Sequence, residues 1–175
     1  MNRRKSLILG TSGVMLLGQH IRGWSTRCAE PTLHQVEGPF YRPNSPLANN
    51  LSLSGELEKT INISGRVLNI YCEPVKEALV EFWHTSPQGV YDNQGFLFRG
   101  RQFTDNFGFY HLTTHMPGSY FGRTKHIHVK IRTKNKLLTT QLYFGDEPLN
   151  NRDYFFNKKL LLSETYSGYK FDFYI

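Results

Sequence analysis

Apolar and polar residues alternate with a period of two in several short segments of the chain, and almost none has the period of a helix. The clearest alternation runs from His126 to Ile131, where β-branched residues fill the apolar places. Because successive side chains of a strand point to opposite faces, this pattern predicts a half-buried strand. Further strands are predicted over residues 59–69, 78–84, 96–101, 110–114, 137–144 and 171–174.

Turn signals that contain Gly or Pro separate these segments, at intervals of about ten to fifteen residues. The one segment with some helical periodicity runs from Tyr154 to Ser163. Short strands joined by turns are typical of an all-β sandwich, so we predict an antiparallel β-sandwich of the prealbumin or transthyretin type. Pro, Asn and Gly are frequent from Pro31 to Asn50, which predicts an extended N-terminal arm lying on that domain.

The strand that starts at His126 carries the first candidate chemistry. Side chains two apart on a strand are roughly 6 to 7 Å from each other, so His126 and His128 could both reach one metal ion. The alternative is that both lie on the solvated face of an edge strand, which Lys130 and Arg132 continue. Two histidines do not complete a metal site, so further donors must come from loops at the same end of the sandwich.

The formal net charge of +7 is unevenly distributed. Five basic residues and no acidic residue precede Glu30, whereas from Glu30 onward 16 basic residues face 14 acidic ones. A nearly neutral body argues against a nucleic-acid partner. The basic residues between Lys125 and Lys136 are interpreted as a solvated strand end and turn, which could also attract an anionic substrate.

Residues 1–29 are predicted to be an export signal, and residues 30–175 a single domain. Arg3 and Arg4 precede an apolar run, 6–18, that is too short to span a bilayer as a helix and suits a secretory signal. The arginine pair resembles a twin-arginine signal, so we expect a periplasmic or secreted protein with no stable membrane span. The alternative is a basic amphipathic tail that stays attached.

The chain has two cysteines, Cys28 and Cys72. Neither has the spacing of a metal site. They could pair in an oxidising compartment if Cys28 survives processing, for which Gly23 to Ser25 is the best cleavage signal. Without further evidence we interpret both cysteines as incidental.

An ordered set of short motifs gives a more specific indication of function than the two histidines alone. Tyr91 and Tyr120 each follow a turn signal, and by itself such a tyrosine is a packing residue. The motifs are, in chain order, Glu37-Gly-Pro-Phe-Tyr41, Leu79-Val-Glu-Phe-Trp-His84, Gly89-Val-Tyr91, Thr104-Asp105, Gly108-Phe-Tyr110, Pro117-Gly-Ser-Tyr120, Arg123-Thr-Lys-His-Ile-His128 and Leu138-Thr-Thr-Gln141. Together this order resembles the intradiol ring-cleavage dioxygenases, a family that includes protocatechuate 3,4-dioxygenase and catechol 1,2-dioxygenase.

The resemblance implies a β-sandwich that holds mononuclear, non-haem Fe(III), with ligands that match Tyr91, Tyr120, His126 and His128. The donors suit the ion, because hard Fe(III) prefers anionic oxygen and can keep a phenol with an ordinary pKa of about 10 in its phenolate form. The implied reaction cleaves a catechol-type ring between its two hydroxyls with O2, giving a cis,cis-muconate-type diacid. Tyr120 would also take a proton from the substrate.

Two further residues match polar positions of the family's substrate pocket. Arg123 would stabilise negative charge on the substrate ring, and Gln141 would hydrogen-bond in the same pocket. Without the resemblance, they would be a surface salt-bridge residue and an inward polar strand residue. His84 is assigned to the core, and His111 and His115 to the strand surface.

The chain also departs from the family pattern. Thr124-Lys125 stands where the family often has Pro-Ala, and the interval from Tyr120 to His126 is short, so we expect a more open site for an undetermined catechol. The chain lacks the helical N-terminal region of catechol 1,2-dioxygenases and is closer in layout to one subunit of protocatechuate 3,4-dioxygenase. Sites in that enzyme lie at a subunit contact, so the resemblance allows a homo- or hetero-oligomer.

Two other functions share part of this pattern. A non-catalytic transthyretin-like binding module would share the sandwich but has no reason to place two tyrosines beside the histidines. A cupin also uses His-x-His but needs a Glu shortly afterwards and a later His, and no acidic residue follows His128 before Asp146.

Overall fold

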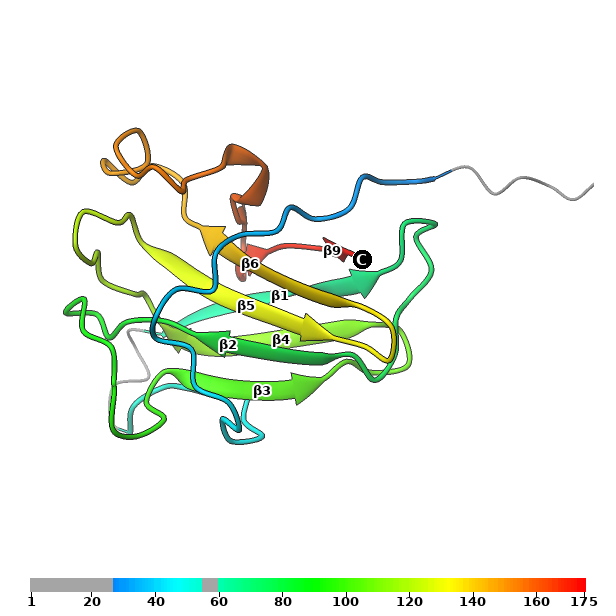
Figure 1. Ribbon diagram of the computed structural model, residues 1–175, viewed down its shortest axis with the longest axis horizontal. Coiled ribbons are helices and arrows are strands. Elements are labelled where there is room, and N and C mark those ends of the chain that lie inside the picture. The colour runs from blue at the N-terminus through cyan, green and yellow to red at the C-terminus, as the bar shows by residue number, and fades with distance from the viewer. Residues whose placement is uncertain (1–26, 55–59) are drawn as a thin grey trace, which may run out of the picture.

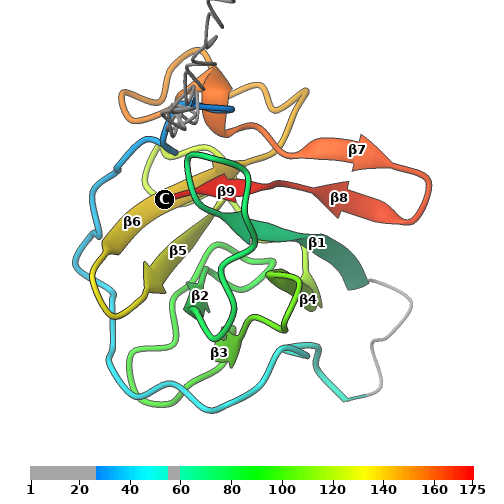
Figure 2. The same ribbon diagram turned by 90° about the vertical axis from the view of Figure 1, so that its right-hand side faces the viewer.

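The computed structural model describes residues 27–54 and 60–175, which form two β-sheets packed face to face (Figure 1 and Figure 2). One sheet has the order β3-β2-β5-β6, and the other the order β4-β1-β8-β7 with β9 also paired to β1. The strands are β1 (Thr60–Leu68), β2 (Leu79–Trp83), β3 (Arg99–Phe103), β4 (Phe109–His115), β5 (His126–Arg132), β6 (Leu137–Tyr143), β7 (Ser163–Thr165), β8 (Gly168–Lys170) and β9 (Phe173–Tyr174). The predicted all-β sandwich is confirmed.

The four-stranded sheet is antiparallel throughout, and β1 pairs antiparallel with β4. The short C-terminal strands β8 and β9 instead run parallel to β1. Residues 1–26 of the predicted export signal lie outside the described part of the chain. Within that part, no helix is long and apolar enough to cross a membrane.

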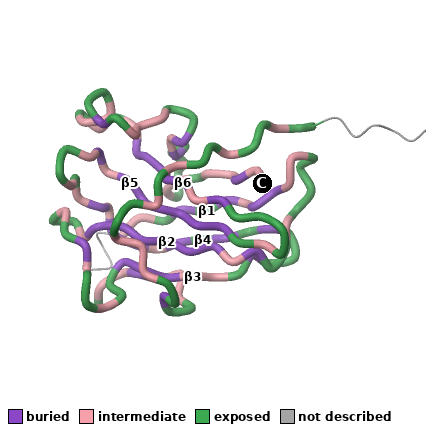
Figure 3. Tube along the Cα trace, in the orientation of Figure 1, coloured by how far each residue is buried: buried purple, intermediate pink, exposed green. Residues whose placement is uncertain are grey.

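The core lies between the two sheets, where apolar side chains from alternate positions meet. β5 contributes Ile127, Val129 and Ile131, and β1 contributes Ile63 and Val67 from the opposite sheet. All five are at most 1% exposed. Figure 3 shows this pattern as buried strands surrounded by exposed loops. The alternation of apolar residues in the sequence therefore identified the core face of these strands.

The predicted N-terminal arm is also confirmed. Its first part runs beside β6, where the Gln35 amide donates to the Thr139 carbonyl at 2.8 Å. Further along, the Ala48 amide donates to the Arg101 carbonyl of β3 at 3.0 Å. The arm, blue to cyan in Figure 1, therefore passes from one edge of the four-stranded sheet to the other.

One predicted strand boundary was wrong, and some short elements were not predicted. The strand predicted over 96–101 begins only at Arg99, because the Asp92 carboxylate accepts hydrogen bonds from the amides of Gln94, Gly95 and Leu97 and holds this segment as a loop. The segment with some helical periodicity, 154–163, contains the 3₁₀ turn η2 (Lys158–Leu160) and, at Ser163, the start of β7. β7 and β8 were not predicted, because they are too short for a period to be recognised.

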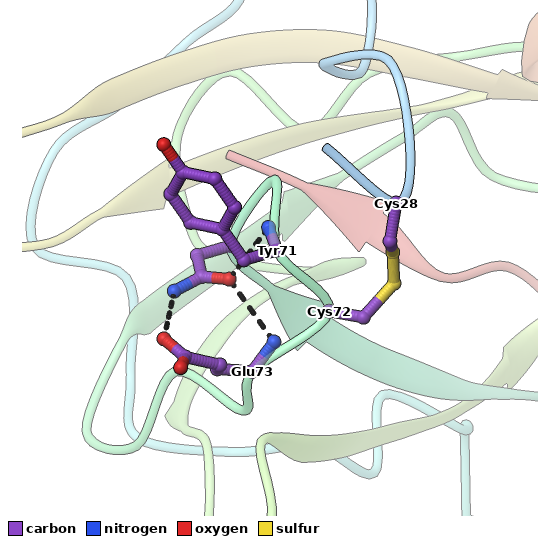
Figure 4. Close-up of a disulfide and its surroundings, with 5 residues drawn as sticks. Cys28, Tyr71, Cys72 and Glu73 are labelled. Carbon is purple, nitrogen blue, oxygen red and sulfur yellow. Dashed lines mark hydrogen bonds between the residues drawn. A yellow bond between two sulfur atoms is a disulfide. The ribbon is translucent and has the colours of Figure 1, made fainter. Parts of the chain in front are cut away.

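Cys28 and Cys72 are joined by a disulfide that ties the start of the described arm to the turn after β1 (Figure 4). Their Cα atoms are 5.9 Å apart. The turn is shaped by Asn69, whose side chain accepts from the amides of Tyr71 and Glu73 at 2.9 and 3.0 Å. The interpretation of both cysteines as incidental was wrong, because two positions 44 residues apart meet only through the fold.

Candidate metal centre

β5 turns its histidines away from the core and toward the arm. His126 and His128 are 4% and 3% exposed, and their ring centroids are 4.9 Å apart. Lys130, the next residue on this face, is also buried, and pairs with Glu37 of the arm. The alternative of a solvated strand face is therefore excluded, because the arm covers it.

The environment of each imidazole favours its neutral form. Nδ1 of His126 lies 2.6 Å from the Thr124 carbonyl oxygen, which can only accept, so Nδ1 carries the proton and Nε2 keeps a lone pair. The His128 ring stacks on Trp83 at 4.8 Å, and its buried Nδ1 has no hydrogen-bond partner within the described part of the chain. Burial, followed by the charge of Arg123, lowers the pKa of His126 to about 4; burial also lowers that of His128 well below its usual value. Neutral imidazole is the form that binds metals.

The loops that carry Tyr91 and Tyr120 are hydrogen-bonded to each other. The Ser86 carbonyl accepts from the amides of both Gly89 and Gly118 at 2.9 Å. Gly89 has φ +78°, and a side chain at this position would overlap the backbone of the second loop. This close contact brings the two tyrosine rings to a centroid distance of 5.5 Å.

The four predicted ligands therefore lie in one place. The Tyr91 ring is 6.4 Å from the His128 ring, which in turn contacts His126. Tyr91 is 6% exposed, and burial raises its phenol pKa above the usual value. A cation bound between these rings would oppose that shift, because it stabilises phenolate.

The arm supplies two contacts to these rings that we did not predict. Phe40 stacks on Tyr91 at 4.3 Å and meets Tyr120 edge-on at 5.3 Å. Gly38, with φ +73°, passes so close to His128 that a Cβ there would lie 3.4 Å from Cε1 and 3.8 Å from Nε2. Both residues belong to the Glu37–Tyr41 motif. This motif contributed to the family resemblance, but the sequence assigned no function to Gly38 or Phe40.

Arg123 and Gln141 are also brought together. Gln141 lies opposite His128 in the register of β5 and β6, and its side-chain oxygen accepts from Nη2 of Arg123 at 2.6 Å. The side-chain Nε2 of Gln141 donates to the Val36 carbonyl of the arm at 2.9 Å. The two predicted pocket residues thus form one hydrogen-bonded unit beside the imidazoles.

Sequence reasoning missed Asp153, which lies in the loop after β6. Its carboxylate accepts from Nε of Arg123 at 2.8 Å, and its side chain is fully buried. Phe155 covers the guanidinium, with its ring centroid 4.7 Å from Cζ. The sequence does not indicate that Asp153 pairs with Arg123, because the two residues are 30 positions apart and Asp153 lies in an ordinary polar loop.

The sequence also assigned places to His84, His111 and His115. His84 is 1% exposed and bonded to the Thr85 carbonyl and the Thr114 hydroxyl, as expected for the core. His111 is exposed, as predicted. The surface assignment of His115 was wrong: it is 1% exposed, and its Nε2 accepts from the Leu53 amide.

The structure also bears on the cupin alternative. Across residues 27–54 and 60–175, no group of three or more His, Cys, Asp or Glu side chains is arranged to hold a metal ion. A metal between the four rings would therefore depend on phenol oxygens.

The short interval from Tyr120 to His126 begins with a tight turn. The Arg123 amide donates to the Tyr120 carbonyl at 2.6 Å, and Phe121, at φ +45°, is 93% exposed. Tyr120 itself is half-buried. The more open site expected from the sequence stays a prediction.

Comparison with protein families gives a match to a family model described as "Dioxygenase" over residues 36–167. The chain is 34% identical over 123 residues to the protocatechuate 3,4-dioxygenase beta chain of Burkholderia cepacia, covering 59% of this chain and 52% of that one. It is 26% identical over 146 residues to a chlorocatechol 1,2-dioxygenase of Cupriavidus pinatubonensis, covering 67% and 56%. The match thus spans about half the length of these curated relatives.

A solved structure has closer similarity. The dioxygenase domain of a dioxygenase and carbohydrate-binding protein fusion from Streptomyces sp. SirexAA-E is 41% identical, with a TM-score of 0.79. The alignment covers 83% of this chain and 98% of that domain. The family match covers most of the described sandwich and includes all four candidate ligands. The chain therefore belongs to the intradiol ring-cleavage dioxygenase family.

Proposed function

We propose that the protein is a non-haem Fe(III) intradiol dioxygenase, which uses O2 to cleave a catechol-type ring between its two hydroxyls and yields a cis,cis-muconate-type diacid. One observation carries the proposal: phenols from two loops and imidazoles from one strand meet in a buried place, with Tyr91 5.5 Å from Tyr120 and 6.4 Å from His128. The names of the relatives support the same reaction class.

The donors fit mononuclear Fe(III). Tyr91, Tyr120, His126 and His128 offer two oxygen and two nitrogen donors, and two phenolates would offset most of a +3 charge in a largely buried site. His126 is already held in the tautomer that leaves Nε2 able to bind, and no side chain or backbone group of residues 27–54 and 60–175 pairs with the buried Nδ1 of His128. Bound Fe(III) would supply a Lewis acid that draws electron density from the catecholate and makes its ring reactive toward O2.

The chain's own residues would perform the remaining work. Tyr120, half-buried at the mouth of the site, would accept a proton from a substrate hydroxyl. Arg123 would stabilise the negative charge that develops on the ring, since its Nη1 has no protein partner among the described residues. Phe40 and Trp83 would exclude water from the rings that they cover.

The test is spectroscopic and catalytic. Protein loaded with ferric iron should show a visible phenolate-to-Fe(III) charge-transfer band, which Tyr91→Phe should shift or weaken. Oxygen uptake and ring-cleaved product should then be measured with catechol, protocatechuate and hydroxyquinol. A colourless ferric-treated protein without oxygen uptake would overturn the proposal and favour the transthyretin-like binding module.

We also propose that the protein is exported through its twin-arginine-like N-terminus and reaches the periplasm or medium. The disulfide between Cys28 and Cys72 supports this, because disulfides persist in oxidising compartments. A mature chain that keeps Cys28 requires cleavage before that residue, as at Gly23 to Ser25. Mass spectrometry of the mature protein tests both points, and replacement of Arg3 and Arg4 by Lys should abolish export.

A further inference from the structure

Asp153 gathers the groups on which the proposed chemistry depends. Oδ2 accepts from Nε of Arg123 at 2.8 Å and from the Thr124 amide at 2.9 Å, while Oδ1 accepts from the Phe155 amide at 2.9 Å. The side chain is fully buried. A buried carboxylate is costly unless it is paired and hydrogen-bonded, and here both oxygens are satisfied. Such charge-assisted bonds are also the strong ones.

These bonds fix the guanidinium of Arg123 from several sides. Asp153 holds Nε, Gln141 holds Nη2 at 2.6 Å, and the Phe155 ring covers Cζ at 4.7 Å. Nη1 has no protein partner among the described residues. An arginine held in this way keeps one N–H pair for the substrate and loses little freedom when it binds.

The same carboxylate is connected to a candidate iron ligand. Asp153 holds the Thr124 amide, and the carbonyl of Thr124 accepts from Nδ1 of His126 at 2.6 Å. Thr124 is completely buried. Asp153 therefore anchors the guanidinium of Arg123 directly and the ring orientation of His126 through Thr124.

We propose that Asp153 is a positioning residue, which holds Arg123 with its Nη1 available to the substrate and keeps His126 in its metal-binding tautomer. This role rests on the proposed function. Asp153 lies in the loop after β6, outside both the strand that carries the histidines and the loops that carry the tyrosines. This loop is therefore a further part of the site.

Asp153→Asn is the informative variant, because it keeps the size and one acceptor oxygen but removes the charge that pairs with Arg123. We expect kcat to fall about 10- to 100-fold in the iron-loaded enzyme. Asp153→Glu keeps the charge and should recover part of the loss. Asn150→Ala is the matched control: Asn150 accepts from the Thr124 hydroxyl at 2.7 Å and anchors the same loop without touching Arg123.

A double-mutant cycle separates positioning from general loop stability. If Asp153 acts through Arg123, Asp153→Asn should cost little further activity in an Arg123→Gln background. Losses that multiply, or an Asn150→Ala variant with an equal loss of kcat, would overturn the proposal. So would kcat values within twofold of wild type for Asp153→Asn. If that variant does not fold, the same cycle with Asp153→Glu decides.

A second readout needs neither iron nor activity, so it distinguishes failure of this inference from failure of the proposed function. In ¹⁵N-labelled iron-free protein, the Arg123 Nε proton should exchange slowly with solvent in wild type and in Asn150→Ala. In Asp153→Asn its exchange should be at least about tenfold faster, since a charge-assisted bond contributes more than 1.4 kcal/mol. Equal exchange rates would show that Asp153 does not hold the guanidinium.

Discussion

The Phe40 ring lies nearly parallel to the Tyr91 ring, with centroids 4.3 Å apart and an interplanar angle of 15°. Phe40 belongs to the arm, whereas Tyr91 belongs to a loop after β2, so the arm forms one wall of the candidate metal centre. The Arg99 guanidinium holds the Phe40 carbonyl at 2.6 Å and fixes the backbone behind this ring.

Phe40→Ala should disturb the tyrosines more than the fold. Aromatic pairs contribute about 0.5–1.5 kcal/mol beyond their buried area, so we expect a loss of roughly 1–2 kcal/mol in the free energy of unfolding. Iron release should accelerate and the charge-transfer band should shift, because Tyr91 and Tyr120 both lose a neighbour. Urea unfolding and chelator-driven iron release measure these effects. Phe103→Ala, at a residue 57% exposed, is the control and should leave the band unchanged.

In the ion pair between Lys130 and Glu37, only the lysine is buried, so we expect the loss of its partner to be costly. The Lys130 side chain is 8% exposed, whereas that of Glu37 is 40% exposed. Glu37→Gln should therefore lower the free energy of unfolding by about 1–3 kcal/mol, because it leaves the lysine charge unpaired. Adding Lys130→Met should recover most of that loss. Urea unfolding of the wild type and of these two variants tests this, and a double variant less stable than Glu37→Gln alone would contradict it.

Removal of the disulfide should loosen the N-terminal end of the arm, where Cys28 lies. Cys72→Ser should reduce the free energy of unfolding by about 2–4 kcal/mol, since the crosslink closes a loop of 44 residues in the unfolded chain. Reduced wild-type protein should lose a similar amount. Hydrogen exchange should show faster opening at Gln35, whose amide pairs with β6, than at core amides such as Val129. Unchanged exchange at Gln35 would mean that the arm is held without the crosslink.

Acid should destabilise the iron-free protein through His84. Burial lowers the pKa of this imidazole from 6.5 to about 4 in the folded protein. The unfolded chain therefore binds more protons between those values, so stability is complete above about pH 6.5 and falls as the pH decreases toward 4, by at most about 3 kcal/mol from this group. Urea unfolding at pH 7 and pH 4.5 should show a smaller difference in His84→Gln. His111→Gln, at an exposed histidine, should keep the wild-type difference.

The strand pattern and its chemical residues could be predicted because both depend on local order. Alternation along 126–131 identified the core face of β5 and placed His126 and His128 together on the other face, since strand geometry alone fixes that relation. The ordered motifs likewise indicated Tyr91 and Tyr120 as partners of the histidines. Their roles as iron ligands remain predictions, whereas their closeness is a structural finding.

What only the tertiary structure decided is what covers those residues. The sequence did not decide between a metal site and a solvated face for the two histidines, but in the structure the arm lies over that face and buries Lys130 as well. The contacts of Phe40, of Asp153 and of the two cysteines span from 30 to more than 40 residues, and no local pattern specifies them. Side-chain alternation reports which face a residue occupies; the packing of distant segments decides whether that face meets water, another ring or a buried charge.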